Sequence, residues 1–389
     1  MNSDNNNNES LSDIQARKKQ AKKYELIHNI LFAVDMVYSV ILVVLFTFTG
    51  GQGGHSARLV EWIGSFAPNY WIQVACYLVI LTTVYLILLL PISFYGGYYL
   101  EHKYQLSNET FFMWLKDKGK SYLLNLIFMV VFGEILYLFF TFTQESWWVW
   151  VGIIWVLFGI VLSNIAPVLI IPLFYKLKPL EDATLTQKLV ALAERVNARI
   201  LGVFEMELSA KTKKANAALA GLGNTKRILL GDTLLSNFNQ DEIEVILAHE
   251  LGHFYYKHMW KLIFFGGAVT FGGLYITSLV LNKVVIQTGF AGITDIAAFP
   301  LFILCMFAFA LISMPITSTF SRILERQADL FALRETGRPN HFISSMKKLA
   351  DLNLADENPH PIIEFLMHDH PSIAKRIKLA EQFALDHSS

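Results

Sequence analysis

The chain of 389 residues is 54% hydrophobic and 16% charged, and its mean hydropathy is +0.42. Soluble domains carry about 25% charged residues, so this composition excludes an ordinary soluble protein. The 32 basic and 32 acidic residues give a net charge of zero, which excludes the strongly basic surface typical of nucleic-acid binding. The two cysteines both lie in apolar runs, which excludes a disulfide framework and a cysteine-ligated zinc site.

Six apolar segments are long enough to cross a bilayer, which takes about 20 residues. The first ten residues are polar and Asn-rich and are predicted to be disordered. A basic stretch between Arg17 and Lys23 then leads into the first segment, which has no cleavage signal at its end and is too long for a signal-peptide core. We therefore predict six membrane helices, over residues 30–48, 72–94, 122–142, 147–174, 262–281 and 297–316.

The loops between these segments differ in their content of lysine and arginine, which favour the cytoplasmic side of a membrane. The tail 1–29, the loop 95–121 and the segment 176–261 are rich in basic residues. The loops 50–71, 143–146 and 282–296 carry only Arg58 and Lys283. Both termini and the polar segments are therefore predicted to face the cytoplasm, at a bacterial inner membrane or the endoplasmic reticulum.

The sequence predicts a mainly α-helical integral membrane protein with a cytoplasmic, zincin-like α+β catalytic domain. A polar N-terminal tail (1–29) precedes a four-helix membrane region (30–175) and a catalytic insert (176–261). Two further membrane helices (262–320) lead to a C-terminal part of the same catalytic domain (321–389). Within the insert we expect an amphipathic helix over 183–198, strands over 203–208 and 227–230, and a helix starting near Asp241.

The clearest motif is His249-Glu250-Leu251-Gly252-His253. Residues four apart lie on one face of a helix, so both imidazoles can reach one Zn²⁺ at about 2.0–2.1 Å. Glu250 is rotated by about 100° from His249, which places it against the attacking water rather than the metal. The motif therefore predicts a zinc peptidase that holds one Zn²⁺ per chain.

A catalytic zinc site needs a third protein ligand, and the candidate is Glu325. It lies just after the sixth membrane segment, on the same predicted side as the two histidines. Asp329 shares its helix face and is placed to hydrogen-bond a ligand imidazole and fix its orientation. Taken alone, such a carboxylate pair is more often a solvated helix face, so the assignment depends on the rest of the sequence.

The chain resembles the type 1 CAAX prenyl proteases, which are integral-membrane zinc metalloendopeptidases, over about residues 72–379. Their motifs occur here in the same order: Phe94-Tyr95 to Lys116-Asp117, Asn164-Ile165-Ala166-Pro167, Asn216-Ala217 with Gly221, the His249–His253 motif, Ser321-Arg322 with Glu325 and Gln327-Ala328-Asp329, and His370-Pro371 with Arg376. The resemblance implies that Glu325 is the third zinc ligand.

The resemblance also implies roles for residues near the metal. Glu250 is expected to take a proton from the attacking water and deliver it to the leaving amine. Asp329 is expected to have a supporting or proton-donating role; hydrogen bonding to a ligand histidine suits it best on physical grounds. His370 or Arg376 is expected to stabilise the developing oxyanion.

Two further regions are implicated in substrate binding. Asn216, Ala217 and Gly221 resemble the strand that lies beside the substrate, which we expect to pair with an extended peptide. Glu134 lies mid-helix in an apolar run, where an ionisable group is a functional candidate by default. It either faces the water-filled chamber that the family's helices surround or makes a helix–helix hydrogen bond. His258, five residues after His253, is expected to be interfacial rather than part of the site.

The sequence alone is compatible with several functions. The substrate is a membrane-associated or lipidated polypeptide, with a prenylated CAAX-type tail as one alternative and misfolded or stalled membrane proteins as the other. Ala218 and Leu219 replace the aromatic pair that usually follows Asn-Ala in the family, so broader specificity stays open. A non-catalytic scaffold is disfavoured because Glu250 and the ligands are all present. A transporter is disfavoured because no symmetric broken helices occur, and an intramembrane protease because charged residues precede the zinc motif.

Overall fold

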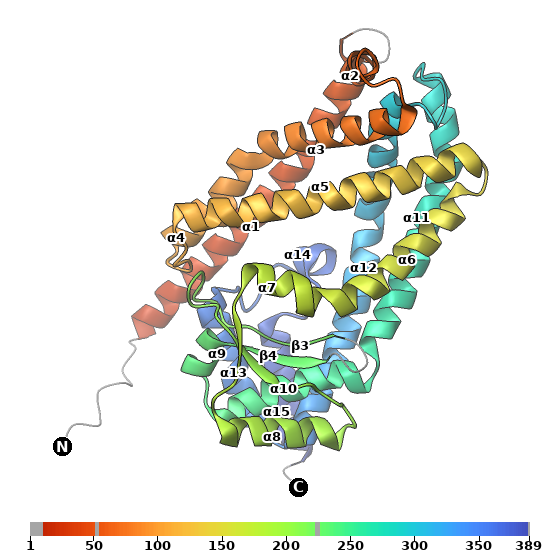
Figure 1. Cartoon of the computed structure of the whole chain (residues 1–389). Coiled ribbons are helices and arrows are strands. Elements are labelled where there is room, and N and C mark those ends of the chain that lie inside the picture. The colour runs from red at the N-terminus through yellow and green to blue at the C-terminus, as the bar shows by residue number, and fades with distance from the viewer. Residues whose placement is uncertain (1–10, 51–53, 222–225, 388–389) are drawn as a thin grey trace, which may run out of the picture.

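The computed structural model of the chain describes residues 11–50, 54–221 and 226–387, so the predicted disorder of residues 1–10 lies outside the described residues. The membrane half contains α1 to α7, α11 and most of α12, and the rest forms the catalytic half (Figure 1). The helices are α1 Leu11–Phe48, α2 Gly54–Gly64, α3 Tyr70–Phe94, α4 Glu101–Lys103, α5 Phe111–Phe142, α6 Trp147–Ile165, α7 Ile171–Phe174, α8 Ala183–Arg195, α9 Asp232–Asn237, α10 Gln240–Tyr255, α11 His258–Gln287, α12 Phe299–Thr336, α13 Pro339–Asn353, α14 Pro361–Met367 and α15 Ile373–Asp386.

The six predicted membrane helices are confirmed among the described residues, where six helical segments are long and apolar enough to span a bilayer. Their polar ends extend further than the apolar runs indicate. α1 begins at Leu11 rather than at residue 30, and α12 continues to Thr336 rather than ending at residue 316. The reason is that the flanking residues are good helix formers such as Gln, Ala, Lys and Arg, so the helix outlasts the apolar segment. α12 thereby carries Glu325 and Asp329 in unbroken helix.

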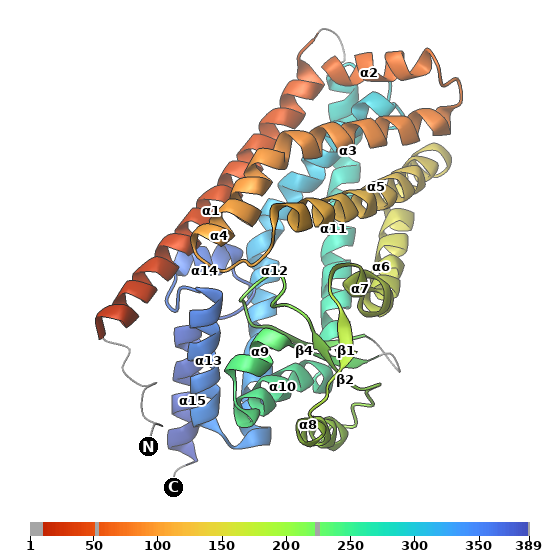
Figure 2. The same ribbon diagram turned by 60° about the vertical axis from the view of Figure 1, so that its left-hand side comes forward.

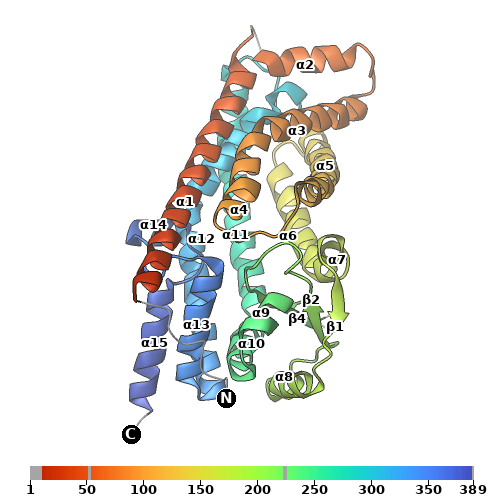
Figure 3. The same cartoon turned by 90° about the vertical axis from the view of Figure 1, so that its left-hand side faces the viewer.

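The membrane helices cross one another rather than forming a parallel bundle. Figure 1 shows α3 and α5 running across α11 and α12. In the turned views of Figures 2 and 3, α1 runs down the side of the molecule from α2 to the level of α14. The start of α1 is tied to the end of α13 and the loop after it, through Arg17–Asp351 at 2.9 Å and Lys18–Glu357 at 2.8 Å. The first membrane helix is therefore fastened to the catalytic half.

Small and aromatic residues pack the membrane half. A Cβ on Gly152 of α6 would lie 2.6 Å from the Phe271 ring of α11, and one on Gly273 of α11 would lie 2.6 Å from the Phe309 ring of α12. Glycine at such positions lets helices approach closely where no hydrophobic force drives them together. The helices α6, α11 and α12 are held side by side in this way, and α12 reaches the catalytic half in a fixed position.

The catalytic half contains a four-stranded sheet in the order β1-β2-β4-β3. β1 pairs antiparallel with β2, β2 parallel with β4, and β4 antiparallel with β3, which leaves β3 at an edge. The predicted strands β2 and β4 are present, β1 was not predicted, and β3 was expected only from the family resemblance of the segment from Asn216 to Gly221. β3 reads Ala-Ala-Leu-Ala, which has neither the β-branched residues nor the alternation typical of a strand. The strands are β1 Leu177–Pro179, β2 Val203–Met206, β3 Ala217–Ala220 and β4 Arg227–Gly231.

One hydrophobic core joins the insert to the C-terminal part. Leu189 from α8, Ile228 from β4, Leu247 from α10 and Phe342 from α13 are all essentially inaccessible to solvent and belong to one cluster. Burial of an aliphatic or aromatic side chain of this size contributes about 1.5–3 kcal/mol. The two parts therefore fold together around α10, although two membrane helices separate them in the sequence.

Candidate metal centre and active site

The first two candidate ligands lie on α10, whose start is fixed by its own side chains. The side chain of Asn239 accepts hydrogen bonds from the backbone amides of Asp241 and Glu242, and Glu242 bonds back to the Asn239 amide. This reciprocal capping satisfies donors that a helix start would otherwise leave free. His249 and His253 follow on one face of the helix. Their Nε2 atoms lie 3.2 Å apart, so both rings point at the same place.

The third candidate ligand reaches this place because α12 packs very closely on α10. A Cβ on Gly252 would lie only 3.0 Å from the Cα of Ala328 and 3.1 Å from the Cβ of Phe331. At this crossing Glu325 Oε2 lies 3.2 Å from His249 Nε2, and Oε1 lies 3.3 Å from His253 Nε2. Among the described residues, His249, His253 and Glu325 are the group whose donor atoms lie close enough together to hold a metal ion.

The spacing of these three donors fits Zn²⁺. Ligands at about 2.0–2.1 Å in a tetrahedral site lie about 3.3 Å from one another. Here the two imidazole nitrogens lie 3.2 Å apart, and each has one oxygen of the Glu325 carboxylate close by, Oε2 at 3.2 Å from His249 and Oε1 at 3.3 Å from His253. Oε2 of Glu325 is buried without a hydrogen-bond partner among the described residues. A buried carboxylate oxygen of this kind calls for a bound ion or water, so the chemistry of the donors and their geometry agree.

His249 is oriented by a carboxylate that is itself held by an arginine. Asp329, fully buried, lies 2.9 Å from His249 Nδ1 through its Oδ1. Arg376 donates to both carboxylate oxygens of Asp329, at 2.6 and 2.9 Å. Burial lowers the pKa of His249, but the carboxylates of Asp329 and Glu325 close to its two ring nitrogens outweigh it and raise that pKa to about 9. The carboxylates around this imidazole therefore favour a positive charge here, either a proton or a bound metal ion.

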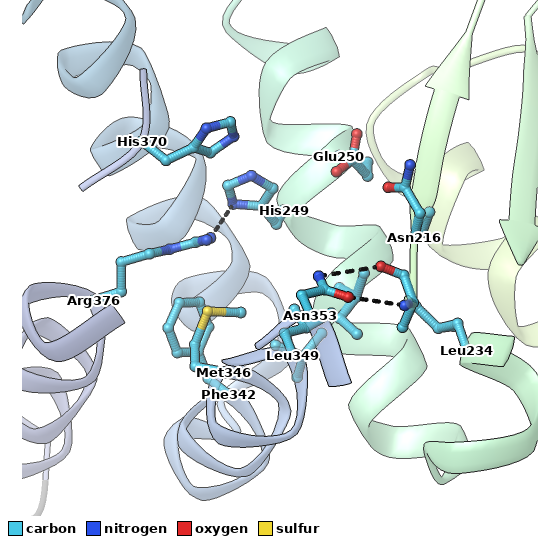
Figure 4. Close-up of a pocket in the computed structure, with 14 residues that line it drawn as sticks. Asn216, Leu234, His249, Glu250, Phe342, Met346, Leu349, Asn353, His370 and Arg376 are labelled. Atoms are coloured by element: carbon cyan, nitrogen blue, oxygen red, sulfur yellow. Dashed lines mark hydrogen bonds between the residues drawn. The ribbon is translucent and has the colours of Figure 1, made fainter. Parts of the chain in front are cut away.

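A pocket of about 170 Å³ lies beside His249, and most of the other candidate site residues line it. Asn216, Ala217, Glu250, His370 and Arg376 line it together with His249 (Figure 4). Figure 4 shows Glu250 on α10 across from Asn216, which immediately precedes the edge strand β3. Water, a peptide and the general-base candidate can therefore meet in one place.

His370 comes from the loop before α15 and reaches the metal group from the other side. Its Nδ1 lies 2.8 Å from Asp369 Oδ1, and its Nε2 lies 3.4 Å from Glu325 Oε2. The hydrogen bond to Asp369 raises the pKa of His370, which burial opposes. Arg376 is placed differently from the sequence expectation, because its guanidinium is forked on Asp329 although it still lines the pocket.

Two predicted substrate-binding residues are not brought to this pocket. Gly221 lies just after β3 with φ at +100°, a left-handed conformation that glycine adopts without strain. Glu134 lies in α5, in the membrane half, and is absent from the lining of the pocket beside His249. This backbone conformation explains why glycine stands at this position.

Comparisons with known proteins agree with this geometry. The sequence pattern of peptidase family M48 matches residues 179–384, which include the three metal-site residues and every residue that lines the pocket. The chain belongs to peptidase family M48. A second pattern, described as CAAX prenyl protease N-terminal with five membrane helices, matches residues 8–176. The described part of that range has four helices long enough to span a membrane, together with the short α2.

Relatives of this M48 peptidase cover most of its length. It is 27% identical over 371 residues to an uncharacterized metalloprotease, YhfN, of Bacillus subtilis, covering 93% of this chain and 85% of that protein. It is 30% identical over 337 residues to CAAX prenyl protease 1 of Saccharomyces cerevisiae, covering 78% and 71% of the two chains. The crystal structure of S. mikatae Ste24p superposes with a TM-score of 0.78 at 26% identity, covering 94% of this chain and 88% of that one. The protein is therefore a multi-pass membrane metalloprotease.

Sequence reasoning missed several residues of the M48 site. Asn353 accepts a hydrogen bond from the Ala215 amide at 3.0 Å and so fixes the backbone before Asn216. Arg322 donates to the carbonyl oxygens of Glu364 and His368, at 2.8 and 2.6 Å, and so holds the loop that carries His370. These residues contact backbone, which leaves no spacing signal in a sequence. The prediction that His258 is interfacial is wrong, because it is fully buried beside His253.

Proposed function

We propose that this chain is a zinc-dependent endopeptidase in which His249, His253 and Glu325 hold one Zn²⁺. The proposal is supported above all by two imidazole nitrogens 3.2 Å apart, each with an oxygen of the Glu325 carboxylate at 3.2–3.3 Å, beside a pocket that His249 lines. When bound, the metal would polarise the scissile carbonyl and lower the pKa of water in the pocket. The chain's own side chains and backbone bind the peptide, move the protons and stabilise the developing charge.

The pocket residues have separate roles in peptide hydrolysis. Glu250 takes the proton of the attacking water and delivers it to the leaving amine. His370, whose Nδ1 is hydrogen-bonded to Asp369, presents Nε2 to the developing oxyanion. Arg376 keeps Asp329 in place and acts on the reaction through it, not by touching the substrate. An extended peptide pairs with the free edge of β3, which puts its backbone beside Asn216.

We assign the substrate to membrane-associated polypeptides, with a prenylated C-terminal tail as the first class to test. The names of several relatives support this class. The structure adds a cavity of about 820 Å³ in the membrane half, lined mainly by apolar side chains of α1, α3 and α12. The basic residues of the inner loops favour an active site on the cytoplasmic side of the membrane.

Purified protein in detergent provides the test of this function. We expect one zinc per chain and peptide cleavage that a chelator abolishes and added Zn²⁺ restores. Glu250→Gln should keep the zinc and lose about 10²- to 10⁴-fold in kcat. Glu335→Gln, which changes an exposed carboxylate on the same helix as Glu325, is the matched control and should behave as wild type. Wild-type protein without zinc, or cleavage that survives in Glu250→Gln, would contradict the proposal.

A protease of membrane proteins without prenyl specificity is the second candidate. It is favoured by β3, where Ala218 and Leu219 leave the strand without aromatic side chains beside the substrate. Matched peptides that differ only in a farnesyl group on the cysteine distinguish the two candidates. A kcat/KM at least ten times higher for the farnesylated peptide supports prenyl recognition, and equal values support the broader protease.

A further inference from the structure

His258 is the first residue of α11, and the chain bends sharply just before it. On one continuous helix a residue five positions after His253 would point about 140° away from it. Here α10 ends at Tyr255 and Lys257 adopts a left-handed conformation, with φ of 55°. The turn brings the His258 side chain back over the end of α10. As a result its ring is fully buried, and its centroid lies 5.0 Å from that of His253 in an edge-to-face arrangement.

Both nitrogens of His258 have a partner. Nδ1 lies 3.0 Å from Nδ1 of His253, and Nε2 lies 3.0 Å from Oε1 of Gln327. Gln327 is two residues after Glu325 on α12, and its Oε1 also accepts a weaker hydrogen bond from Lys261 at 3.4 Å. The three side chains thus form a row that starts at a candidate metal ligand and ends on the helix that supplies the third ligand.

The protons in this row follow from the heavy atoms. His253 Nε2 faces His249 Nε2 and Glu325 Oε1, so as a metal ligand it carries no proton there. The neutral ring then has its proton on Nδ1, which donates to Nδ1 of His258. His258 must therefore carry its own proton on Nε2, and this donates to the amide oxygen of Gln327, which is only an acceptor. Each nitrogen and oxygen in the row is therefore either a donor or an acceptor, and every donor faces an acceptor.

We propose that His258 is a positioning residue that fixes the ring orientation and tautomer of the ligand His253, with Gln327 holding His258 in turn. The inference rests on the proposed metal site. Asp329 performs the same task for His249, but Asp329 is an anion and His258 is neutral. A neutral acceptor orients the ligand without adding negative charge, so the metal keeps more of its power to polarise a carbonyl. The two ligand histidines are therefore supported in unequal ways.

The experiment compares two substitutions of His258 in the full-length, detergent-purified protein. His258→Phe keeps the aromatic volume but removes the acceptor, whereas the side-chain oxygen of His258→Asn retains an acceptor close to the position of Nδ1. We expect His258→Phe to bind Zn²⁺ about 10- to 100-fold more weakly in competition with a chromophoric chelator. His258→Asn should recover most of that affinity. The visible spectrum of the Co²⁺-substituted protein should change in His258→Phe and not in His258→Asn.

A matched control comes from His102, whose two ring nitrogens also have partners, the carbonyl oxygens of Tyr98 and Glu109, at 2.7 and 2.8 Å. His102→Phe loses these bonds away from the metal and should keep wild-type zinc affinity and cobalt spectrum. Wild-type affinity and spectrum in His258→Phe would overturn the inference, as would an equal loss in His102→Phe. If His258→Phe does not fold, Gln327→Leu tests the other end of the row and must also weaken zinc binding. Failure of the wild type to bind zinc would instead refute the proposed function.

Discussion

Helices α10 and α12 approach each other closely at Gly252, inside the His249–His253 motif, and this contact holds Glu325 of α12 beside the two histidines. In Gly252→Ala the new Cβ would lie 3.0 Å from Ala328 Cα, whereas carbon atoms in contact are about 3.5–4.0 Å apart. The obstacle is backbone and cannot rotate away, so the helices must separate by a few tenths of an ångström. Metal–ligand distances tolerate only about 0.2 Å, and Glu325 moves with α12. We therefore expect zinc affinity to fall about 10- to 100-fold, with a matching loss of peptide cleavage.

Zinc affinity and thermal unfolding measured on the same preparation separate this effect from general damage. Alanine gains about 1 kcal/mol in helix propensity over glycine, and overpacking costs about 1–3 kcal/mol, so the unfolding temperature changes little or falls modestly. Gly119→Ala is the control, since nothing lies within 4 Å of its added Cβ, and it should leave zinc binding unchanged. Wild-type zinc affinity in Gly252→Ala would refute the reasoning that this contact sets the ligand geometry.

Two further predictions concern the support of the site. Burial raises the pKa of Glu242, but Lys348 and two neighbouring donors outweigh it and lower that pKa. The stabilisation is therefore present above the ordinary glutamate pKa of about 4.3 and is lost as the pH falls through the folded-state value. Glu242→Gln should flatten this acid-side loss in thermal unfolding measured between pH 3 and 7, and an unchanged slope would contradict the assignment. Asn353→Ala removes the hydrogen bonds that hold the backbone of Ala215. Steady-state kinetics should then show a KM raised several-fold with kcat nearly unchanged. A lower kcat with an unchanged KM would contradict a role of Asn353 in substrate binding.

Most of the membrane architecture could be predicted from the sequence because bilayer thickness imposes a minimum apolar length. This criterion identified all six segments, but it did not identify where each helix begins and ends. The length of α1 before residue 30 and of α12 after residue 316 depends on helix-forming polar residues, which the apolar criterion ignores. The crossing of α3 and α5 over α11 and α12 has no local sequence signal, since it depends on which side chains pack between helices.

The cluster that could hold a metal was predicted in two ways: His249 and His253 from their spacing on one helix, and Glu325 from the family resemblance. The residues around this cluster were harder to predict. β3 was expected only from the family resemblance, because its stability comes from pairing with β4 rather than from its own alanines, which carry no strand pattern. The role of His258 was misjudged because a single left-handed residue, Lys257, changes the direction of the chain. A count of residues along an assumed helix cannot detect such a bend.

The three metal-site residues are divided by two membrane helices, and this division affects how the protein is made. His249 and His253 are synthesised before α11, and Glu325 only after α11 and the apolar part of α12. The donors therefore cannot meet until both helices have been inserted with their ends on the same side. A nascent chain on the ribosome, or one whose last hairpin fails to insert, lacks a complete metal site. Proteolytic activity that depends on this site therefore requires both membrane helices to be in place.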